Sequence, residues 1–186
     1  MSSNRIRVSR SPARRPFRYQ RRIRFGDTDA AGIVYTGRVS DMALEAMEVW
    51  FRERLNIDWY DNHRKSSVDA PCVHLEIDFR SPMTPRDILD IAVLLERASG
   101  SSLQIRLVAR NAIDATLKWQ SRFVFACVDM KTFTGRPIPR SWQKLLKREL
   151  AVTGTADALD EWTERASKIP PSGARRPGRA VRAARA

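Results

Sequence analysis

The sequence predicts an α+β fold in which an antiparallel β-sheet wraps around one long, enclosed helix. Residues 38–55 carry apolar side chains at helical spacing and over so much of the circumference that the helix should be largely buried. Four strand-like runs follow one another between residues 72 and 129, separated by short turns. One helix followed by a meander of strands favours an antiparallel sheet over alternating β-α-β units.

The N-terminal part of the chain leads into a turn that carries two carboxylates. Residues 1–16 are rich in Arg and Ser, and we expect them to form a disordered basic arm. From Phe17 to Phe25, apolar residues recur at even spacing and predict a strand with one buried face. Asp27 and Asp29 follow, and Thr36 is placed to cap the helix with its hydroxyl group. The two carboxylates therefore lie between a strand and the start of the helix.

The later elements are predicted from changes in the spacing of apolar residues along the chain. Residues 56–71 are polar and irregular, with Trp59 and Tyr60 as aromatic anchors. Strands are expected over residues 72–79, 88–98, 103–110 and 117–129. After Pro139, one short helix and a second amphipathic piece over residues 156–168 are expected. The predicted organisation is a basic arm over residues 1–16, one domain over 17–140, a helical extension over 141–168 and a disordered basic tail over 169–186.

The formal net charge of +13 belongs to the two ends of the chain. Residues 1–22 hold eight Arg and residues 169–186 hold five, with no acid in either segment, so residues 23–168 are formally neutral. Arg-rich arms can bind phosphate polymers through counterion release. These arms lack interleaved aromatic residues and any recognised nucleic-acid motif, so we do not expect nucleic acid as a partner.

Cysteine usage and hydropathy point to a soluble cytoplasmic protein. Cys72 and Cys127 fall in strand-like runs without metal-ligand spacing, and we expect both to be small buried residues. No disulfide framework is visible, which suits the cytosol. We find neither a secretory signal nor an apolar span long enough for a membrane helix. We also expect no bound metal.

The run Gly26-Asp27-Thr28-Asp29-Ala30-Ala31-Gly32-Ile33-Val34-Tyr35 is the strongest candidate for chemistry. Its glycines permit a tight, irregular turn. The open N–H groups at a helix start favour an oxygen that carries negative charge, so a carboxylate nearby suggests a nucleophile or base beside an oxyanion site. The alternative is that both Asp side chains only cap the turn.

This run, ahead of a helix rich in Ala, Met, Glu and Trp, resembles the signature of the 4-hydroxybenzoyl-CoA thioesterase family of hotdog-fold enzymes. The resemblance extends more loosely over residues 17–140. It implies an acyl-CoA thioesterase that releases a carboxylic acid and free coenzyme A (CoA). Asp29 would be the catalytic nucleophile or general base, while backbone N–H groups polarise the thioester carbonyl. CoA would enter only as part of the substrate, so no cofactor is expected.

The resemblance also suggests further site residues. We expect contacts to substrate from Gly32, Tyr35, Thr36 and Trp59. Arg106, Arg110 and Arg136 are the candidates for contacts to the CoA phosphates, although residues of this kind in strands and loops are more often solvated charges. Leu44 and Ala70 stand where the family would bind a phenolic hydroxyl group, which argues for a less polar aryl or alkyl acyl group.

Some alternatives remain open. Asp27 is expected to shape the turn, and Glu45 is either a second catalytic candidate or a partner for an Arg. His63 and His74 lie near no Ser or Cys nucleophile in the sequence. The carrier could be acyl carrier protein instead of CoA, or the protein could bind acyl thioesters without hydrolysing them. A nucleic-acid accessory protein acting through the arms is a third class. The family implies a homo-oligomer, a dimer of dimers, and a sheet edge also needs covering.

Overall fold

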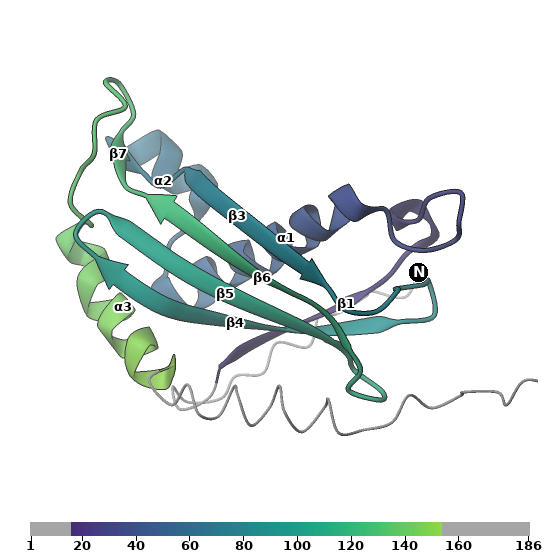
Figure 1. Ribbon diagram of the computed structural model, residues 1–186. Coiled ribbons are helices and arrows are strands. Elements are labelled where there is room, and N and C mark those ends of the chain that lie inside the picture. Colours follow the sequence, from purple (N-terminus) through teal and green to yellow (C-terminus); the bar gives the residue numbers. More distant parts are fainter. Residues whose placement is uncertain (1–15, 154–186) are drawn as a thin grey trace, which may run out of the picture.

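The computed structural model describes residues 16–153, in which an antiparallel sheet curls over one long helix (Figure 1). The sheet has five strands in the order β1-β4-β5-β6-β3, and a separate ladder joins β2 to β7. The elements are β1 (Phe17–Arg22), η1 (Phe25–Asp27), α1 (Thr36–Leu55), α2 (Trp59–Lys65), β2 (Val68–Asp69), β3 (Cys72–Phe79), β4 (Ile88–Ser99), β5 (Ser102–Asn111), β6 (Leu117–Ala126), β7 (Val128–Asp129) and α3 (Arg140–Thr153).

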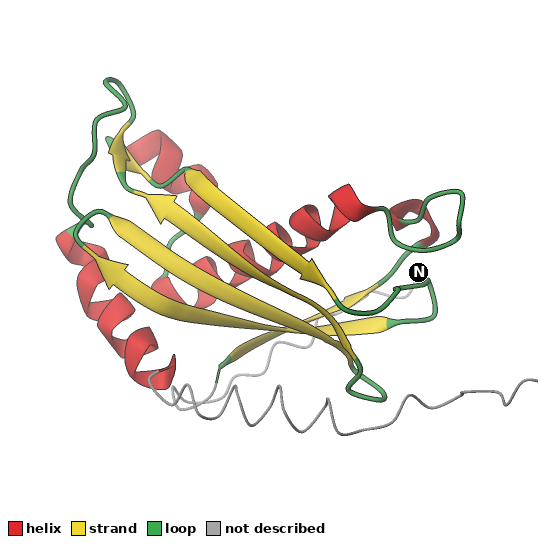
Figure 2. Ribbon diagram, viewed as in Figure 1, coloured by secondary structure: helices red, strands yellow, loops and turns green. Residues whose placement is uncertain are grey.

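The core lies between α1 and the concave face of the sheet. Alternate residues of β4, β5 and β6 face the helix, and Trp50 of α1 and Trp119 of β6 are both fully buried there. In Figure 2, α1 lies behind the sheet and α3 stands at one end of it. α3 closes that end with Trp142 and Leu146, which belong to the same core. α1 ends at Asn56, whose left-handed backbone (φ +54°) is a common helix C-cap conformation.

The predicted meander around a central helix is confirmed. Expected and observed strands agree to within two residues at most ends, although the last expected strand is divided into β6 and β7. α3 corresponds to the first expected C-terminal helix. The basic arm up to residue 15, the amphipathic piece over residues 156–168 and the basic tail lie outside the described residues. The domain boundaries stay predictions. Within residues 16–153, no helix has the length and apolar character needed to cross a membrane.

Three local predictions near the start of the fold were wrong. Thr36 is the first residue of α1, not its cap; Tyr35 occupies the N-cap position and makes no side-chain capping bond. Phe25 is 86% exposed, because the strand stops at Arg22 and the chain turns through η1. The segment expected to be irregular contains α2, which Asp58 caps by accepting a hydrogen bond from the Asp61 N–H at 3.0 Å.

β3 is the edge strand beside β6, and it differs most from its predicted burial. The alternating pattern predicts one buried face, yet Leu75 and Phe79 are 41% and 49% exposed. Both pair with core-facing residues of β6, so they point to the same side of the sheet as α1, which leaves them uncovered within one protomer. Cys72 at the start of β3 is exposed for the same reason, whereas Cys127 is buried as expected.

Candidate active site

The turn that carries Asp29 is a closed loop between β1 and α1. Thr28 and Val34 form an isolated antiparallel bridge. Inside it, the Asp29 N–H donates to the Ile33 carbonyl oxygen at 2.9 Å, and the Gly32 N–H donates to the Asp29 carbonyl oxygen at 3.0 Å. Gly32 has φ +75°, a left-handed conformation that glycine adopts without steric strain. These bonds give the loop one defined backbone path.

The Asp29 side chain is presented at the surface of the protomer. Its Oδ1 atom accepts a hydrogen bond from the Ala31 N–H at 2.8 Å, a local contact typical of Asp in turns. The side chain is otherwise exposed. α1 begins a few residues later without a side-chain cap, so its first N–H groups and positive dipole end can attract an anionic oxygen. An exposed carboxylate and an uncapped helix start therefore follow one another in the chain.

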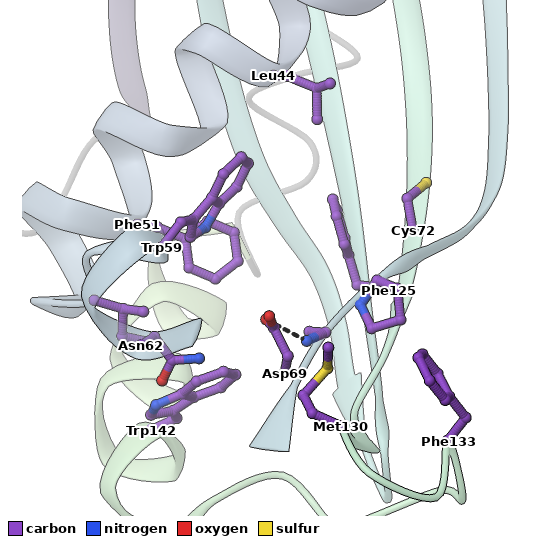
Figure 3. Close-up of a pocket in the computed structure, with 13 residues that line it drawn as sticks. Leu44, Phe51, Trp59, Asn62, Asp69, Cys72, Phe125, Met130, Phe133 and Trp142 are labelled. Carbon is purple, nitrogen blue, oxygen red and sulfur yellow. Dashed lines mark hydrogen bonds between the residues drawn. The ribbon is translucent and has the colours of Figure 1, made fainter. Parts of the chain in front are cut away.

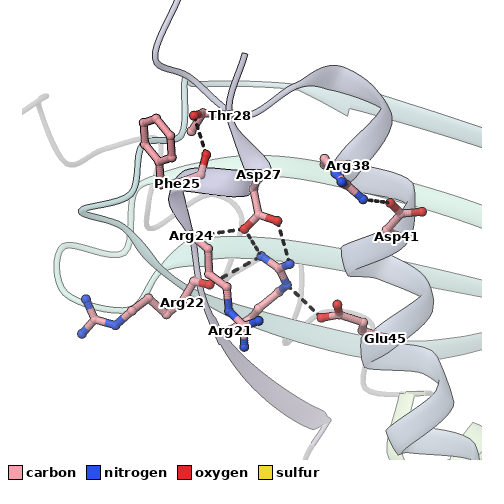
Figure 4. A network of polar contacts seen from close by, with 9 residues as sticks. All are labelled: Arg21, Arg22, Arg24, Phe25, Asp27, Thr28, Arg38, Asp41 and Glu45. Atoms are coloured by element: carbon pink, nitrogen blue, oxygen red, sulfur yellow. Dashed lines mark hydrogen bonds and ion pairs between the residues drawn. The ribbon is translucent and has the colours of Figure 1, made fainter. Parts of the chain in front are cut away.

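Asp27, in contrast, is buried in an ion-pair network that fixes the turn (Figure 4). Its carboxylate accepts hydrogen bonds from Nη1 and Nη2 of Arg21 at 2.8 and 3.0 Å and from the Arg24 N–H at 2.8 Å. The bonds from Arg21 are the main reason why the pKa of Asp27 is lowered. Nε of Arg21 donates to Glu45 at 2.8 Å. Asp27 thus shapes the turn, and Glu45 is the partner of an Arg, as one alternative proposed.

A largely apolar cavity of about 290 Å³ lies at the other end of α1 (Figure 3). Seven segments contribute to it: α1, the connection between α1 and α2, α2, the β2–β3 region, the end of β6, the loop after β7, and α3. Trp59 lies in its wall, and the rings of Trp59 and Phe51 are 5.5 Å apart at their centroids. Leu44 and Ala70, the two positions associated with a phenolic hydroxyl group, line the same cavity. Neither can donate a side-chain hydrogen bond.

The predicted substrate contacts are thus divided between two places in the protomer. Trp59 lines the cavity, whereas Gly32, Tyr35 and Thr36 belong to the Asp29 turn and the start of α1 and do not line it. Tyr35 is 58% exposed and its ring lies over Gly37, where an added Cβ would be 2.8 Å from the ring and would displace it. The substrate roles of these four residues stay predictions.

The three candidate phosphate ligands also lie apart. Arg106 and Arg110 alternate with core-facing residues of β5, so they lie on the face of the sheet opposite α1. Arg106 pairs with Glu96, and buried Arg110 donates to a backbone carbonyl. Arg136 follows β7 and pairs with Asp129 at 2.9 Å. Of the three, only Arg136 shares a loop with residues that line the cavity.

Among residues 16–153, no three His, Cys, Asp or Glu side chains lie close enough together to hold a metal ion.

Comparison with known proteins decides the family. A model described as the thioesterase-like superfamily matches residues 23–175. The chain belongs to the thioesterase-like superfamily. This confirms the resemblance seen around Asp29, and it agrees with the curved sheet and central helix of a hotdog fold.

Relatives and solved structures of the superfamily agree with this assignment. A 1,4-dihydroxy-2-naphthoyl-CoA hydrolase of Nostoc punctiforme is 32% identical over 123 residues, which are 66% of this chain and 81% of that protein. A hydrolase of the same name from Synechococcus elongatus is 31% identical over 134 residues, 70% and 95% of the two chains. The crystal structure of a 1,4-dihydroxy-2-naphthoyl-CoA thioesterase from Synechocystis matches with a TM-score of 0.67 and 26% identity, over 70% and 95% of the chains.

A more distant structure shows that the same fold occurs with CoA. A Staphylococcus aureus protein in complex with CoA matches with a TM-score of 0.69 over 77% of this chain and 89% of that chain. The sequence identity is only 9%, so this match shows the fold alone. The hotdog fold predicted for this superfamily member is confirmed by both kinds of comparison.

Sequence reasoning missed two parts of the site. Arg21 is not among the candidate residues from the sequence, yet it occupies the core-facing position after Phe17 and Tyr19. A signal was present, since Arg21 is the one polar interruption in an apolar series with period two. The cavity walls formed by Met130 and Phe133 had no comparable signal, because nothing in a loop sequence indicates which distant helix it faces.

Proposed function

We propose that this protein is an acyl-CoA thioesterase that hydrolyses an aryl or other apolar acyl-CoA to the carboxylic acid and free CoA. The observation that carries the proposal is the Asp29 carboxylate. It is exposed, it is oriented by one backbone amide, and it lies in the turn ahead of an uncapped helix start. Membership of the thioesterase-like superfamily and relatives named as acyl-CoA hydrolases support the same chemistry.

In the proposed reaction, Asp29 attacks the thioester carbonyl carbon or removes a proton from the water that attacks it. The carbonyl oxygen then gains negative charge, which N–H groups at the start of α1 would stabilise. Collapse of the tetrahedral intermediate breaks the C–S bond, and the thiolate of CoA takes up a proton. If Asp29 acts as nucleophile, water hydrolyses the resulting acyl-enzyme anhydride.

The cavity is the proposed site of the acyl group. Its walls are mostly aromatic and aliphatic, and its polar residues are already engaged: Oδ1 of Asp69 accepts from the Ala70 N–H at 2.8 Å, and Asn62 donates to the Val68 carbonyl oxygen at 3.2 Å. With Leu44 in the wall, a hydroxyl group directed at that position would lose its hydrogen bonds to water. An apolar ring or chain fits this cavity better.

Pairing of two protomers would bring the two halves of the site together. The chain just after β3 reaches the Asp29 turn, because the Val34 N–H donates to the Met83 carbonyl oxygen at 2.9 Å. At the other end of β3, Cys72 lines the cavity. In an antiparallel β3–β3 pair, Cys72 of the partner subunit would therefore lie towards the Asp29 turn. The exposed apolar residues of β3 would be covered at the same time.

A dimer of this kind is the proposed functional unit, and a dimer of such dimers is the proposed full assembly. The Asp29 turn itself exposes Phe25, Ile33 and Tyr35, by 86%, 38% and 58%. Such a group of large apolar side chains at one end of a protomer is typical of a surface that another chain covers. Such an arrangement would place a cavity next to Asp29, which does not line the apolar cavity of its own protomer.

The direct test is release of thiol from a panel of aryl and fatty acyl thioesters, offered on both CoA and acyl carrier protein. Asp29→Asn should abolish turnover without changing the circular dichroism spectrum. Asp41→Asn is the matched control, because Asp41 is also an exposed Asp near the start of α1 and pairs only with Arg38 among the described contacts. Full activity of Asp29→Asn would contradict the proposed catalytic role of Asp29. Binding of thioesters without turnover by the wild type would favour a non-catalytic binding protein.

A further inference from the structure

One loop at the cavity is held in an unusually defined shape by Asp129. Its Oδ1 atom accepts from the N–H groups of Lys131 and Thr132 at 2.9 and 3.2 Å. Its Oδ2 atom accepts from Nη2 of Arg136 at 2.9 Å, and its N–H donates to the Thr134 carbonyl oxygen at 2.9 Å. The pKa of Asp129 is lowered to about 2, chiefly by the bond from Arg136. The loop is therefore fixed at neutral pH by a charged carboxylate.

This loop places Phe133 in a backbone conformation that suits glycine. Phe133 has φ +52°, and its N–H donates to the Asp129 carbonyl oxygen at 2.8 Å. Left-handed backbone is strained for a bulky residue, and such strain is informative where the surrounding structure enforces it. Two other described non-glycine residues have positive φ: Asn56, which ends α1, and Ala115 in the β5–β6 turn. Neither residue lines the apolar cavity that Phe133 borders.

Burial in the core does not account for Phe133. Its side chain is 70% exposed, so it contributes little to the stability of the protomer. It nevertheless lines the cavity together with Trp59, Phe125 and Trp142 (Figure 3). A ligand that fills the cavity would bury part of this exposed aromatic ring.

We propose that Phe133 is a specificity-determining residue, which forms the outer wall of the acyl site and selects planar aromatic acyl groups over small ones. The inference rests on the proposed thioesterase function and adds a residue and a ligand class to it. A flat ring held between Phe133 and the opposite aromatic side chains would bury two faces at once, and stacked or edge-on aromatic pairs are favourable beyond their buried area. An acetyl group is too small to reach this wall.

The test compares Phe133→Ala and Phe133→Gly with the wild type on 2-naphthoyl-CoA and acetyl-CoA. Both variants should lower kcat/KM for 2-naphthoyl-CoA about tenfold more than kcat/KM for acetyl-CoA, mainly through KM. Phe133→Gly also removes the backbone strain, so its thermal midpoint should not fall. Ile113→Ala is the control for loss of an exposed apolar side chain, because Ile113 is 78% exposed and does not line the cavity.

Two kinetic results would overturn the inference: an equal loss for both thioesters, or no loss for either. Failure of the proposed function gives a different result, in which the wild type hydrolyses no thioester at all. Binding of 2-naphthoate then decides, measured by quenching of tryptophan fluorescence, since Trp59 and Trp142 line the cavity. Weaker binding to Phe133→Gly than to the wild type supports the role of Phe133, and equal binding contradicts it.

Discussion

The guanidinium group of Arg21 holds the carboxylate of Asp27 through two hydrogen bonds of 2.8 and 3.0 Å. Both side chains are nearly buried, with 13% and 10% of their surface exposed. Asp27 in turn accepts a backbone hydrogen bond from Tyr35 at its carbonyl oxygen. The pair therefore links β1 to both ends of the loop that carries Asp29.

The first prediction concerns stability at low pH. The pKa of Asp27 is lowered in the folded state from its ordinary value of 3.8, so the pair contributes its full stability above pH about 4 and loses it as the pH falls below that value. Asp27→Asn should cost about 2 kcal/mol of unfolding free energy at pH 7. The difference in stability between this variant and the wild type should shrink as the pH falls below about 4, because the wild-type carboxylate then becomes protonated. Urea unfolding of both proteins at several pH values measures this difference in unfolding free energy.

The matched control for that experiment is Asp41→Asn, which removes an exposed partner of Arg38. Its effect on stability should be small, because exposed ion pairs contribute little. A constant difference between wild type and Asp27→Asn across the pH range would show that the carboxylate charge of Asp27 is not what stabilises the turn.

The second prediction concerns the junction of α3 with α1. Glu149 is 4% exposed, and its Oε2 atom accepts a hydrogen bond from Nε1 of Trp50 at 3.3 Å; Nη1 of Arg54 lies 3.9 Å from Oε1. Glu149→Ala should cost about 2–3 kcal/mol, because it removes the acceptor of the buried Trp50 indole N–H. Chemical denaturation checks this, with exposed Glu53→Ala of α1 as control. Equal stability of the two variants would contradict the prediction.

The regular spacing of apolar residues within each element explains how much of the fold could be predicted from the sequence. The buried residues of α1 repeat at helical spacing, those of β6 repeat at every second position from Trp119 to Phe125, and β4 contains a continuous buried run, so the sequence shows each element directly. α2 has no apolar stripe of its own, and its only signal is Asp58 as an N-cap. The pattern of β3 correctly indicates a face that prefers burial, but no pattern states whether α1 or a second chain would cover it.

The candidate site could be predicted only where its residues are adjacent in sequence. Asp29, Gly32 and Tyr35 lie in one short run, and the resemblance to a family identified them together. The cavity brings Leu44 of α1 together with Phe125 of β6 and Trp142 of α3, which are far apart in the chain. Trp59 was included in the prediction because aromatic residues often line such pockets. The division of the site between Asp29 and the cavity follows from tertiary structure alone.

The third prediction concerns the free edge of the sheet. Leu75→Glu places a charge on the exposed face of β3, where the proposed partner would bury it, and should convert the protein to monomers with at least a tenfold loss of thioesterase activity. Sedimentation velocity measures the assembly state. Gln20→Glu is the control, because Gln20 is exposed on β1, the opposite edge strand. A fully active monomeric Leu75→Glu variant would contradict an active site shared between subunits.

The last prediction tests that shared site by complementation. Asp29→Asn removes the carboxylate, and Leu44→Trp fills the cavity, so each variant alone should be inactive. If Asp29 of one protomer serves the cavity of its partner, a mixed dimer contains one intact site and one doubly damaged site. Random exchange of equal amounts should then restore roughly a quarter of wild-type turnover, since half of the dimers are mixed. Turnover is measured before and after subunit exchange. If the two residues served the same protomer's site, every site would keep one defect, and exchange would restore nothing.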